Sequence, residues 1–195
     1  TSGVFATRLV GFKSFGRNPR YTYFGGNSEM RGYNYLEFSG QNAVFANAEL
    51  RFPIINAALT PIGVIGGIRG VFFTDVGGGW FNGQGFSFFR KSPETFTPVV
   101  DYQRDPLTGF LLQDGSGAAI PIYGPSTTVN GLRLRDGRAS YGLGLETFVF
   151  GFPLHFDWSW RTLLNRDWEN VLFASNGGSS AFRKSRFGVW IGYDF

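Results

Sequence analysis

The chain's single histidine lies in a segment whose alternating residues could, in another setting, carry hydrolase chemistry. His155, Asp157 and Ser159 occupy every second position after Leu154, so in an extended strand they share one face. In a hydrolase of this kind, the serine hydroxyl and the carboxylate must each lie within hydrogen-bond distance of the imidazole. Residues two apart on a strand are separated by about 6.6–7 Å, which is too far for direct bonding. We therefore interpret the three as a polar strand face and expect no enzyme activity.

Other kinds of reactive or binding site have little support. The chain has no cysteine and one histidine, which excludes thiolate chemistry and argues against a transition-metal site. Glycine runs at 77–79 and 83–85 lack the strand-to-helix layout of a nucleotide-binding loop. The 18 Lys and Arg residues are scattered, so we expect no nucleic-acid partner. Four aspartates also lack the spacing of a calcium loop: Asp101, Asp105, Asp114 and Asp136. We predict no catalytic, cofactor-binding or metal-binding residue.

The composition is unusual for a soluble domain. Aromatic residues make up 18% and charged residues only 16% of the chain, against roughly 25% charged residues in an ordinary soluble domain. The mean hydropathy is −0.08, and no uncharged apolar run reaches the roughly 18 residues of a membrane-spanning helix. Strands with one lipid-facing and one polar face fit this composition. A phenylalanine-rich soluble β-sandwich fits it equally well.

Alternation of apolar and polar residues predicts six strands. Short connections at 52–63 and 150–154 alternate with long ones at 16–42, 77–139 and 164–186, a segregation typical of transmembrane barrels with periplasmic turns and extracellular loops. Pro53 is expected to end the second strand. The six predicted strands are Val4–Phe15, Ala43–Phe52, Gly63–Val76, Ser140–Phe150, Leu154–Leu163 and Phe187–Phe195.

The last two predicted strands have the clearest faces. In the fifth, Leu154, Phe156, Trp158 and Trp160 alternate with His155, Asp157, Ser159 and Arg161. In the sixth, apolar residues fall at every second position up to the terminal phenylalanine. This pattern resembles the C-terminal assembly signature of outer-membrane β-barrels, and the resemblance implies that the barrel-assembly machinery reads this strand. The residues of the signature are Phe187, Val189, Ile191, Tyr193 and Phe195.

A second resemblance spans most of the chain. Residues 24–33 read FGGNSEMRGY, residues 47–53 read NAELRFP, and residues 72–77 read FFTDVG. In this order they resemble the sixth-loop motif and the two following strands of the surface-antigen superfamily of outer-membrane assembly and secretion barrels (BamA/TamA-like). The resemblance implies that the loop folds back into the lumen and that Arg31 pairs with Glu49 and Asp75. Gly32 and Tyr33 complete the motif that would lock the loop.

The resemblance also implies the architecture. The fold class is all-β, an antiparallel transmembrane β-barrel of which residues 1–195 supply the last six of sixteen strands. Six strands cannot close a barrel, since bacterial barrels start at about eight. We expect a lumen loop at 16–42 and a long extracellular loop at 77–139. That loop contains a hairpin-like piece at 110–123 and an apolar cluster, so it is either a cap with its own small core or a docking surface for protein partners. The cluster comprises Phe86, Phe88, Phe89 and Phe96.

Two functions remain open at this point. One is an assembly-factor-like component for insertion or translocation of proteins at the bacterial outer membrane, in contact with its lipid. The other is a structural or anchoring barrel that is a subunit of a larger complex. The same barrel occurs in chains with unrelated periplasmic domains, so the barrel pattern alone does not distinguish the two functions.

Overall fold

The structure, a computed structural model, describes residues 2–60, 63–149 and 151–192, and the chain forms two compact units. The first unit comprises Thr1–Phe88, Asp136–Thr162 and Ser185–Phe195, and the second comprises Phe89–Arg135 and Leu163–Lys184. No helix in the described part of the chain is long and apolar enough to cross a membrane.

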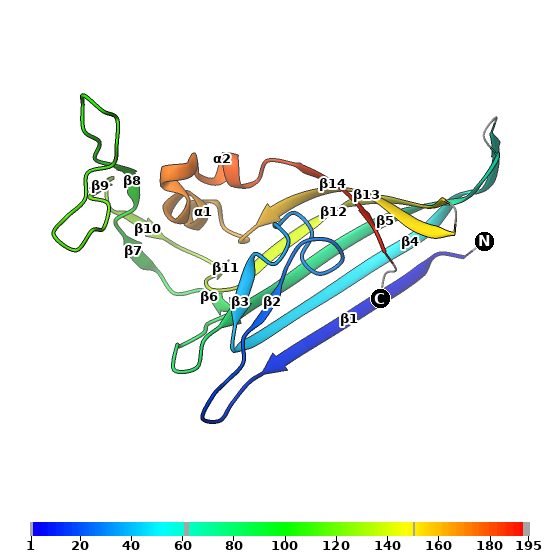
Figure 1. The fold of residues 1–195 in the computed structure, drawn as a ribbon, viewed down its shortest axis with the longest axis horizontal. Coiled ribbons are helices and arrows are strands. Elements are labelled where there is room, and N and C mark those ends of the chain that lie inside the picture. The colour runs from blue at the N-terminus through cyan, green and yellow to red at the C-terminus, as the bar shows by residue number, and fades with distance from the viewer. Residues whose placement is uncertain (1, 61–62, 150, 193–195) are drawn as a thin grey trace. The chain divides into compact units, whose positions relative to one another are not determined.

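A six-stranded antiparallel sheet dominates the first unit (Figure 1). The six predicted strands are thus confirmed. They lie side by side in the sheet in the same order in which they follow one another along the chain. Within the described residues the sheet is open, with its first and last strands as edges. Its strands, in spatial order, are β1 (Val4–Lys13), β4 (Asn42–Thr60), β5 (Gly63–Trp80), β12 (Arg138–Val149), β13 (Phe152–Thr162) and β14 (Arg186–Ile191).

The prediction that Pro53 ends the second strand is wrong. β4 continues to Thr60, with an irregularity in its pairing with β5 between Pro53 and Ile55. On its other side β4 pairs with β1 only up to Arg51, so Pro53 stands where that edge has become free. A proline can occupy such a position because the ladder needs no N–H from it. The two short connections, β4–β5 and β12–β13, define what we call the turn side of the sheet.

The third strand also runs further than predicted, to Trp80. Gly77, Gly78 and Gly79 remain in the ladder, opposite Phe45, Val44 and Ala43 of β4. A glycine run weakens a strand by itself, but here all three glycines pair with β4, and Gly77 also pairs with Arg138 of β12. A Cβ on Gly77 would lie 2.7 Å from the Cβ of Phe45, so the close packing at this point requires glycine.

One face of the sheet is apolar along a row that crosses all six strands. Each residue in the row is the direct ladder partner of the next, and each is 39–70% exposed. We call this face the outer face. The row consists of Phe5, Leu50, Phe72, Leu143, Trp158 and Phe187.

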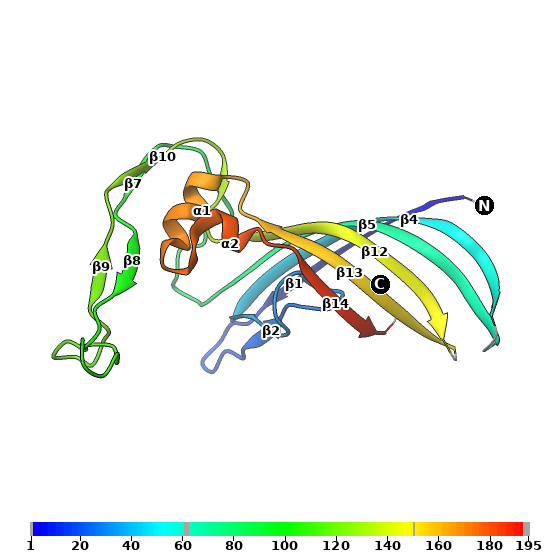
Figure 2. The ribbon, with the colours of Figure 1, turned by 90° about the horizontal axis from the view of Figure 1, so that it is seen from above.

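The opposite, inner face carries buried polar side chains. The sheet is strongly curved, and the loop between β1 and β4 lies against its concave side (Figure 2). The loop contains a two-stranded piece made of β2 (Thr22–Phe24) and β3 (Phe38–Gly40). Alternation therefore separates the two faces as predicted. The buried polar side chains of the inner face include Asn47, Glu49, Asp75, Ser140, Glu146, His155, Asp157 and Ser159.

The second unit contains helices that the sequence reading missed. Residues 164–186 were expected to be a loop, but they form α1 (Arg166–Leu172), a 3-10 turn (Ala174–Asn176) and α2 (Gly178–Phe182). Asn165 caps α1 by accepting a hydrogen bond from the Trp168 N–H, as N-cap residues do. Seven-residue and five-residue helices are too short to show a clear helical period, and they depend on packing for stability.

Six short strands complete the second unit. The hairpin expected within 110–123 is present: Gln113 bridges Ala119, and the Ile120 N–H donates to the Leu112 carbonyl. The core of this unit is formed by side chains such as Val129, Leu134, Leu163, Trp168 and Phe182. The strands are β6 (Phe89–Arg90), β7 (Glu94–Phe96), β8 (Val99–Tyr102), β9 (Pro121–Tyr123), β10 (Thr127–Val129) and β11 (Arg133–Leu134).

The four phenylalanines of the predicted apolar cluster are divided between the two units. Phe86 and Phe88 pack together in the first unit, where Phe86 also stacks on Trp80. Phe96 packs on Trp168 in the second unit, and Phe89 is 54% exposed. Residues close in sequence were assigned to one core, whereas the boundary between the units falls directly after Phe88.

Candidate functional site

The loop between β1 and β4 makes a tight turn at the Gly25–Gly26 pair. Both glycines have positive φ, +126° and +74°, a region that favours glycine because it has no Cβ. The N–H groups of Glu29 and Met30 donate to the Gly26 carbonyl, and the Gly26 N–H donates to the Met30 carbonyl. Met30 is fully buried. This turn directs the next residue, Arg31, at the inner face of the sheet.

Arg31 ends between two carboxylates of adjacent strands. Its Nη1 lies 2.6 Å from Glu49 Oε1 on β4, and its Nη2 lies 2.7 Å from Asp75 Oδ1 on β5. Nε and the backbone N–H of Arg31 both donate to Asp75 Oδ2, at 2.9 and 3.0 Å. The three side chains are at most 4% exposed. The structure thus brings together the arginine and the two acidic residues singled out by the sequence.

A second arginine extends this group along β4. Arg51 donates from Nε to Glu49 Oε2 at 2.8 Å, and its Nη2 lies 2.6 Å from the same oxygen. The order is therefore Arg51, Glu49, Arg31, Asp75, with positive and negative charges in alternation. We call these four residues the loop anchor. Charges buried away from water need partners of this kind, and the anchor contains two of each sign.

Three further residues of the anchor's surroundings escaped the sequence reading. The Phe73 ring lies under Arg31, 3.7 Å from ring centroid to Cζ, in the geometry of a cation–π contact. Asn47 donates from Nδ2 to Asp75 Oδ1 and to the Glu29 carbonyl, and Arg8 Nε donates to Asn47 Oδ1. The alternation of β4 could have identified Asn47, because it shares a face with Glu49. Nothing in the sequence pairs Arg8 with it.

The charge of Arg31 is secured by its neighbours. Burial alone would lower the pKa of its guanidinium, but the hydrogen bonds that it donates to Asp75 and the charges of Asp75 and Glu49 outweigh burial and raise it. The arrangement can hold a loop against the sheet.

Gly32 and Tyr33 continue the contact with the sheet. Gly32 has a φ of +84°, and a Cβ there would lie 2.9 Å from the Ser159 hydroxyl oxygen of β13. The Tyr33 hydroxyl donates to the Ala139 carbonyl of β12 at 3.0 Å. Burial raises the pKa of Tyr33, so the hydroxyl keeps the proton it donates. Residues 31–33 thus contact four consecutive strands, from β4 to β13.

The remaining residues singled out by the sequence lie on β13 and β14. The His155 ring stacks on Trp190, with centroids 3.7 Å apart, and its Nε2 lies 2.9 Å from the Gly192 carbonyl oxygen. Asp157 accepts a hydrogen bond from Trp190 Nε1, and Ser159 donates to the Arg186 carbonyl. Each of the three thus bonds to β14 or the residue after it. No three His, Cys, Asp or Glu side chains of the described segments gather as metal ligands would.

The terminal signature can be followed in part. Phe187, Val189 and Ile191 are 57, 53 and 67% exposed on the outer face, and they alternate with Gly188 and Trp190 as predicted. Tyr193 and Phe195 lie outside the described residues.

Residues 12–195 match the family model described as the Omp85 superfamily domain. The chain belongs to the Omp85 superfamily. This confirms the resemblance to the outer-membrane assembly and secretion barrels inferred from residues 24–33, 47–53 and 72–77. No curated protein and no solved structure matches the chain. Membership of the Omp85 superfamily indicates an outer-membrane protein with a general role in protein insertion or translocation.

Proposed function

We propose that this chain is the C-terminal part of an assembly-factor-type barrel that inserts or translocates proteins at the bacterial outer membrane. The observation that carries the proposal is the loop anchor. A loop held against the inner face by buried charges blocks a passive pore, so transport must use another route. The seam between β14, the last strand, and the first strand of the barrel offers one, because a weakly paired strand edge can template pairing with an incoming strand.

The six strands are, in this proposal, the last six of a sixteen-stranded barrel. The outer face, with its apolar row of exposed side chains, contacts membrane lipid. The loop at 16–42 lies in the lumen and the segment at 77–139 on the extracellular side. Glu49 and Asp75 face inward and are neutralised by Arg31, which removes the kcal/mol-scale cost of a charge on the lipid face. Phe187, Val189, Ile191, Tyr193 and Phe195 serve as the signal for the barrel-assembly machinery.

We propose further that the protein is not an enzyme and uses no cofactor or metal ion. His155, Asp157 and Ser159 bond to β14 and its flank rather than to one another. Their contacts are those of a polar inner wall beside the last strand. Nucleic acid is not among the proposed partners, because the basic side chains of the inner face pair largely with carboxylates of the same face.

Reconstitution tests the function directly. The protein, isolated from its native membrane, is placed in liposomes, and a urea-unfolded outer-membrane barrel is added. We expect wild-type protein to accelerate folding of the client, because the edge of β14 at the barrel seam can pair with a client strand. Folding no faster than in empty liposomes would contradict the proposal. The intact mass of the denatured chain tests the architecture, since sixteen strands require a mass well above 21.6 kDa.

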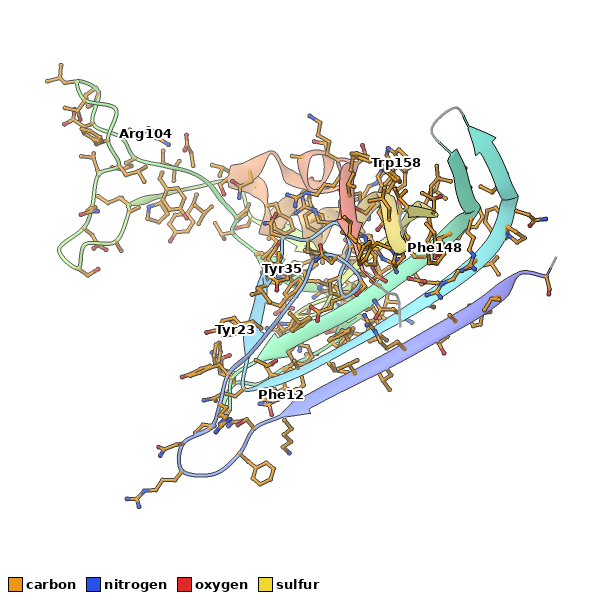
Figure 3. All side chains as sticks on the ribbon, turned by 45° about the vertical axis from the view of Figure 1, so that its right-hand side comes forward. Phe12, Tyr23, Tyr35, Arg104, Phe148 and Trp158 are labelled. Carbon is orange, nitrogen blue, oxygen red and sulfur yellow. The ribbon has the colours of Figure 1, made fainter. Side chains whose placement is uncertain are left out.

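A second function, anchoring of a larger complex, is favoured by a turn of the second unit at residues 105–110. Leu107 is 94% and Phe110 76% exposed in this turn, which follows Arg104, labelled in Figure 3. Asp105 holds this turn by accepting hydrogen bonds from the Leu107 and Thr108 N–H groups. A preordered turn that presents apolar side chains suits contact with a protein partner. Stable co-purification with an abundant complex, without client folding, would favour this function over the first.

A further inference from the structure

A cavity of about 390 Å³ opens on the inner face at the turn side of the sheet. Two guanidinium groups line it, Arg51 from β4 and Arg69 from β5, together with the Asn56 amide. None of the described residues that line it is acidic. Apolar surface from Val4 and Phe148, among others, completes the wall. We call this cavity the turn-side pocket. Arg51 and Arg69 are paired with Glu49 and Glu146, which do not line the pocket.

The pocket lies where two neighbouring strands part. The ladder between β5 and β12 ends at the pair Arg69–Glu146. Beyond this pair, the described residues of β5 pair only with β4, and Thr147–Val149 of β12 pair only with β13. Gly67 and Phe148 line the pocket from either side of the gap, and Figure 3 labels Phe148 there. Each strand therefore presents a backbone edge of the kind to which an extended segment can add.

Arg69 is placed to receive a ligand. Its side chain is 49% exposed, and its Nη1 lies 3.5 Å from Glu146 Oε1, which is longer than a strong charge-assisted hydrogen bond. Its Cζ lies 5.7 Å from the centre of the Phe148 ring, which limits where the guanidinium can lie. Arg51, by contrast, is 16% exposed and is bound to Glu49. A carboxylate entering the pocket would therefore meet Arg69 first.

We propose that the turn-side pocket binds a carboxylate carried by an extended polypeptide segment. Three observations favour this occupant: a half-exposed arginine, Arg69, whose ion pair with Glu146 is 3.5 Å long, the backbone edges at the gap, and a position on the inner face, opposite the apolar row. A lipid headgroup has the charge but would have to reach the inner face. The inference rests on the proposed function, since the segment would belong to a client or partner on the turn side of the barrel.

The test uses the full chain from its native membrane in phosphatidylcholine nanodiscs and two fluorescein-labelled peptides. Both peptides alternate Thr and Val, and they differ only in one central residue, Glu or Gln. Fluorescence anisotropy gives the Kd of each. We expect the Glu peptide to bind about tenfold more tightly, the effect of one charge-assisted hydrogen bond. Equal affinities would overturn the proposal, and this comparison needs no variant.

Two substitutions locate the site. Arg69→Gln should abolish the preference for the Glu peptide, whereas Arg104→Gln, the same charge change on the exposed hairpin of the second unit, should leave it intact. Equal loss in both variants would mean that net charge alone attracts the peptide, and the proposal would fail. If Arg69→Gln does not fold, the variant Asn56→Cys is used instead, and thiol-reactive forms of the Glu and Gln peptides are added to it. We expect the Glu peptide to label the introduced thiol faster than the Gln peptide does. Equal labelling rates would overturn the proposal.

Nanodiscs that contain phosphatidylglycerol separate peptide from lipid. Unchanged peptide affinity supports the proposal. Displacement of the Glu peptide from wild-type protein by this anionic lipid would assign the pocket to lipid phosphate and overturn it. The liposome folding assay distinguishes failure of the pocket inference from failure of the proposed function. If client folding is accelerated but the peptides do not discriminate, only the pocket inference fails.

Discussion

Arg31 makes three hydrogen bonds to the single carboxylate of Asp75, from its backbone N–H, Nε and Nη2. The backbone of the loop, and not only the end of a flexible side chain, is therefore fixed to β5. The fourth contact, from Nη1 to Glu49, adds β4. Both acids are buried on neighbouring strands. If the loop leaves, Asp75 loses its arginine partner and Glu49 keeps only Arg51, which is costly for buried carboxylates.

Arg31→Ala should lower the free energy of unfolding by about 3–5 kcal/mol, the cost of leaving partners of a buried ion pair uncompensated. Arg31→Lys should recover little of this, because a single ammonium cannot reproduce the planar fork. The temperature at which the folded form is lost on SDS gels measures both. Arg17→Ala, in the exposed part of the same loop, is the control. Wild-type heat resistance in Arg31→Ala would contradict the anchor.

Gly32→Ala should destabilise the loop contact for two separable reasons. The φ of +84° costs about 1–2 kcal/mol for a residue with a Cβ, and the close approach to Ser159 Oγ adds about 1–3 kcal/mol of overpacking. Gly16→Ala isolates the backbone effect, because its φ is +104° and no atom lies within 4 Å of the added Cβ. Adding Ser159→Gly to Gly32→Ala should restore part of the heat resistance. Absence of any restoration would refute the steric component.

Trp158 and Trp190 should respond oppositely to brominated phospholipids. Trp158, labelled in Figure 3, is 39% exposed in the apolar row of the outer face. Trp190 stacks on His155 and donates to Asp157 on the inner face. Two variants are compared, one in which Trp158 is the only tryptophan and one in which Trp190 is, with the other four tryptophans of the chain replaced by Phe in each. We expect bromine to quench the fluorescence of Trp158 strongly and that of Trp190 weakly. Equal quenching would show that the faces do not separate lipid from lumen.

The second unit should loosen in acid because of Glu169. Burial disfavours its charge, but hydrogen bonds from Arg183, the Leu163 N–H and Ser179 outweigh burial, so its pKa is lowered from the ordinary value of 4.5. The stabilisation is therefore complete above pH 4.5 and is lost as the pH falls through the lowered pKa. Hydrogen exchange of residues 166–172 should accelerate over that range. Glu169→Gln should exchange fast at all pH values, and a retained pH dependence in this variant would exclude Glu169 as the cause.

The sequence predicted the six strands because each has a period of two that a lipid-facing strand must keep. It also predicted the faces of β13 and β14, which follow from alternation alone. Its errors concern strand ends and the second unit. Pro53 and Gly77–Gly79 normally end strands, yet here the free edge at Pro53 and the neighbours of the glycines allow β4 and β5 to continue. Residues 166–182 form helices too short for their period to be read.

For the loop anchor, the sequence by itself determined the participants: a resemblance pointed to Arg31, Glu49 and Asp75, whose types are complementary in charge. Only the tertiary structure decided how they meet, and it added Phe73, Asn47, Arg8 and Arg51. The physical reason is that local patterns specify which face a side chain occupies, whereas contacts across 18–44 residues depend on strand register and on the path of the loop. The separation of β5 and β12 beyond Arg69 was not predicted for the same reason. The end of a ladder depends on both strands together, so the sequence of one strand cannot show it.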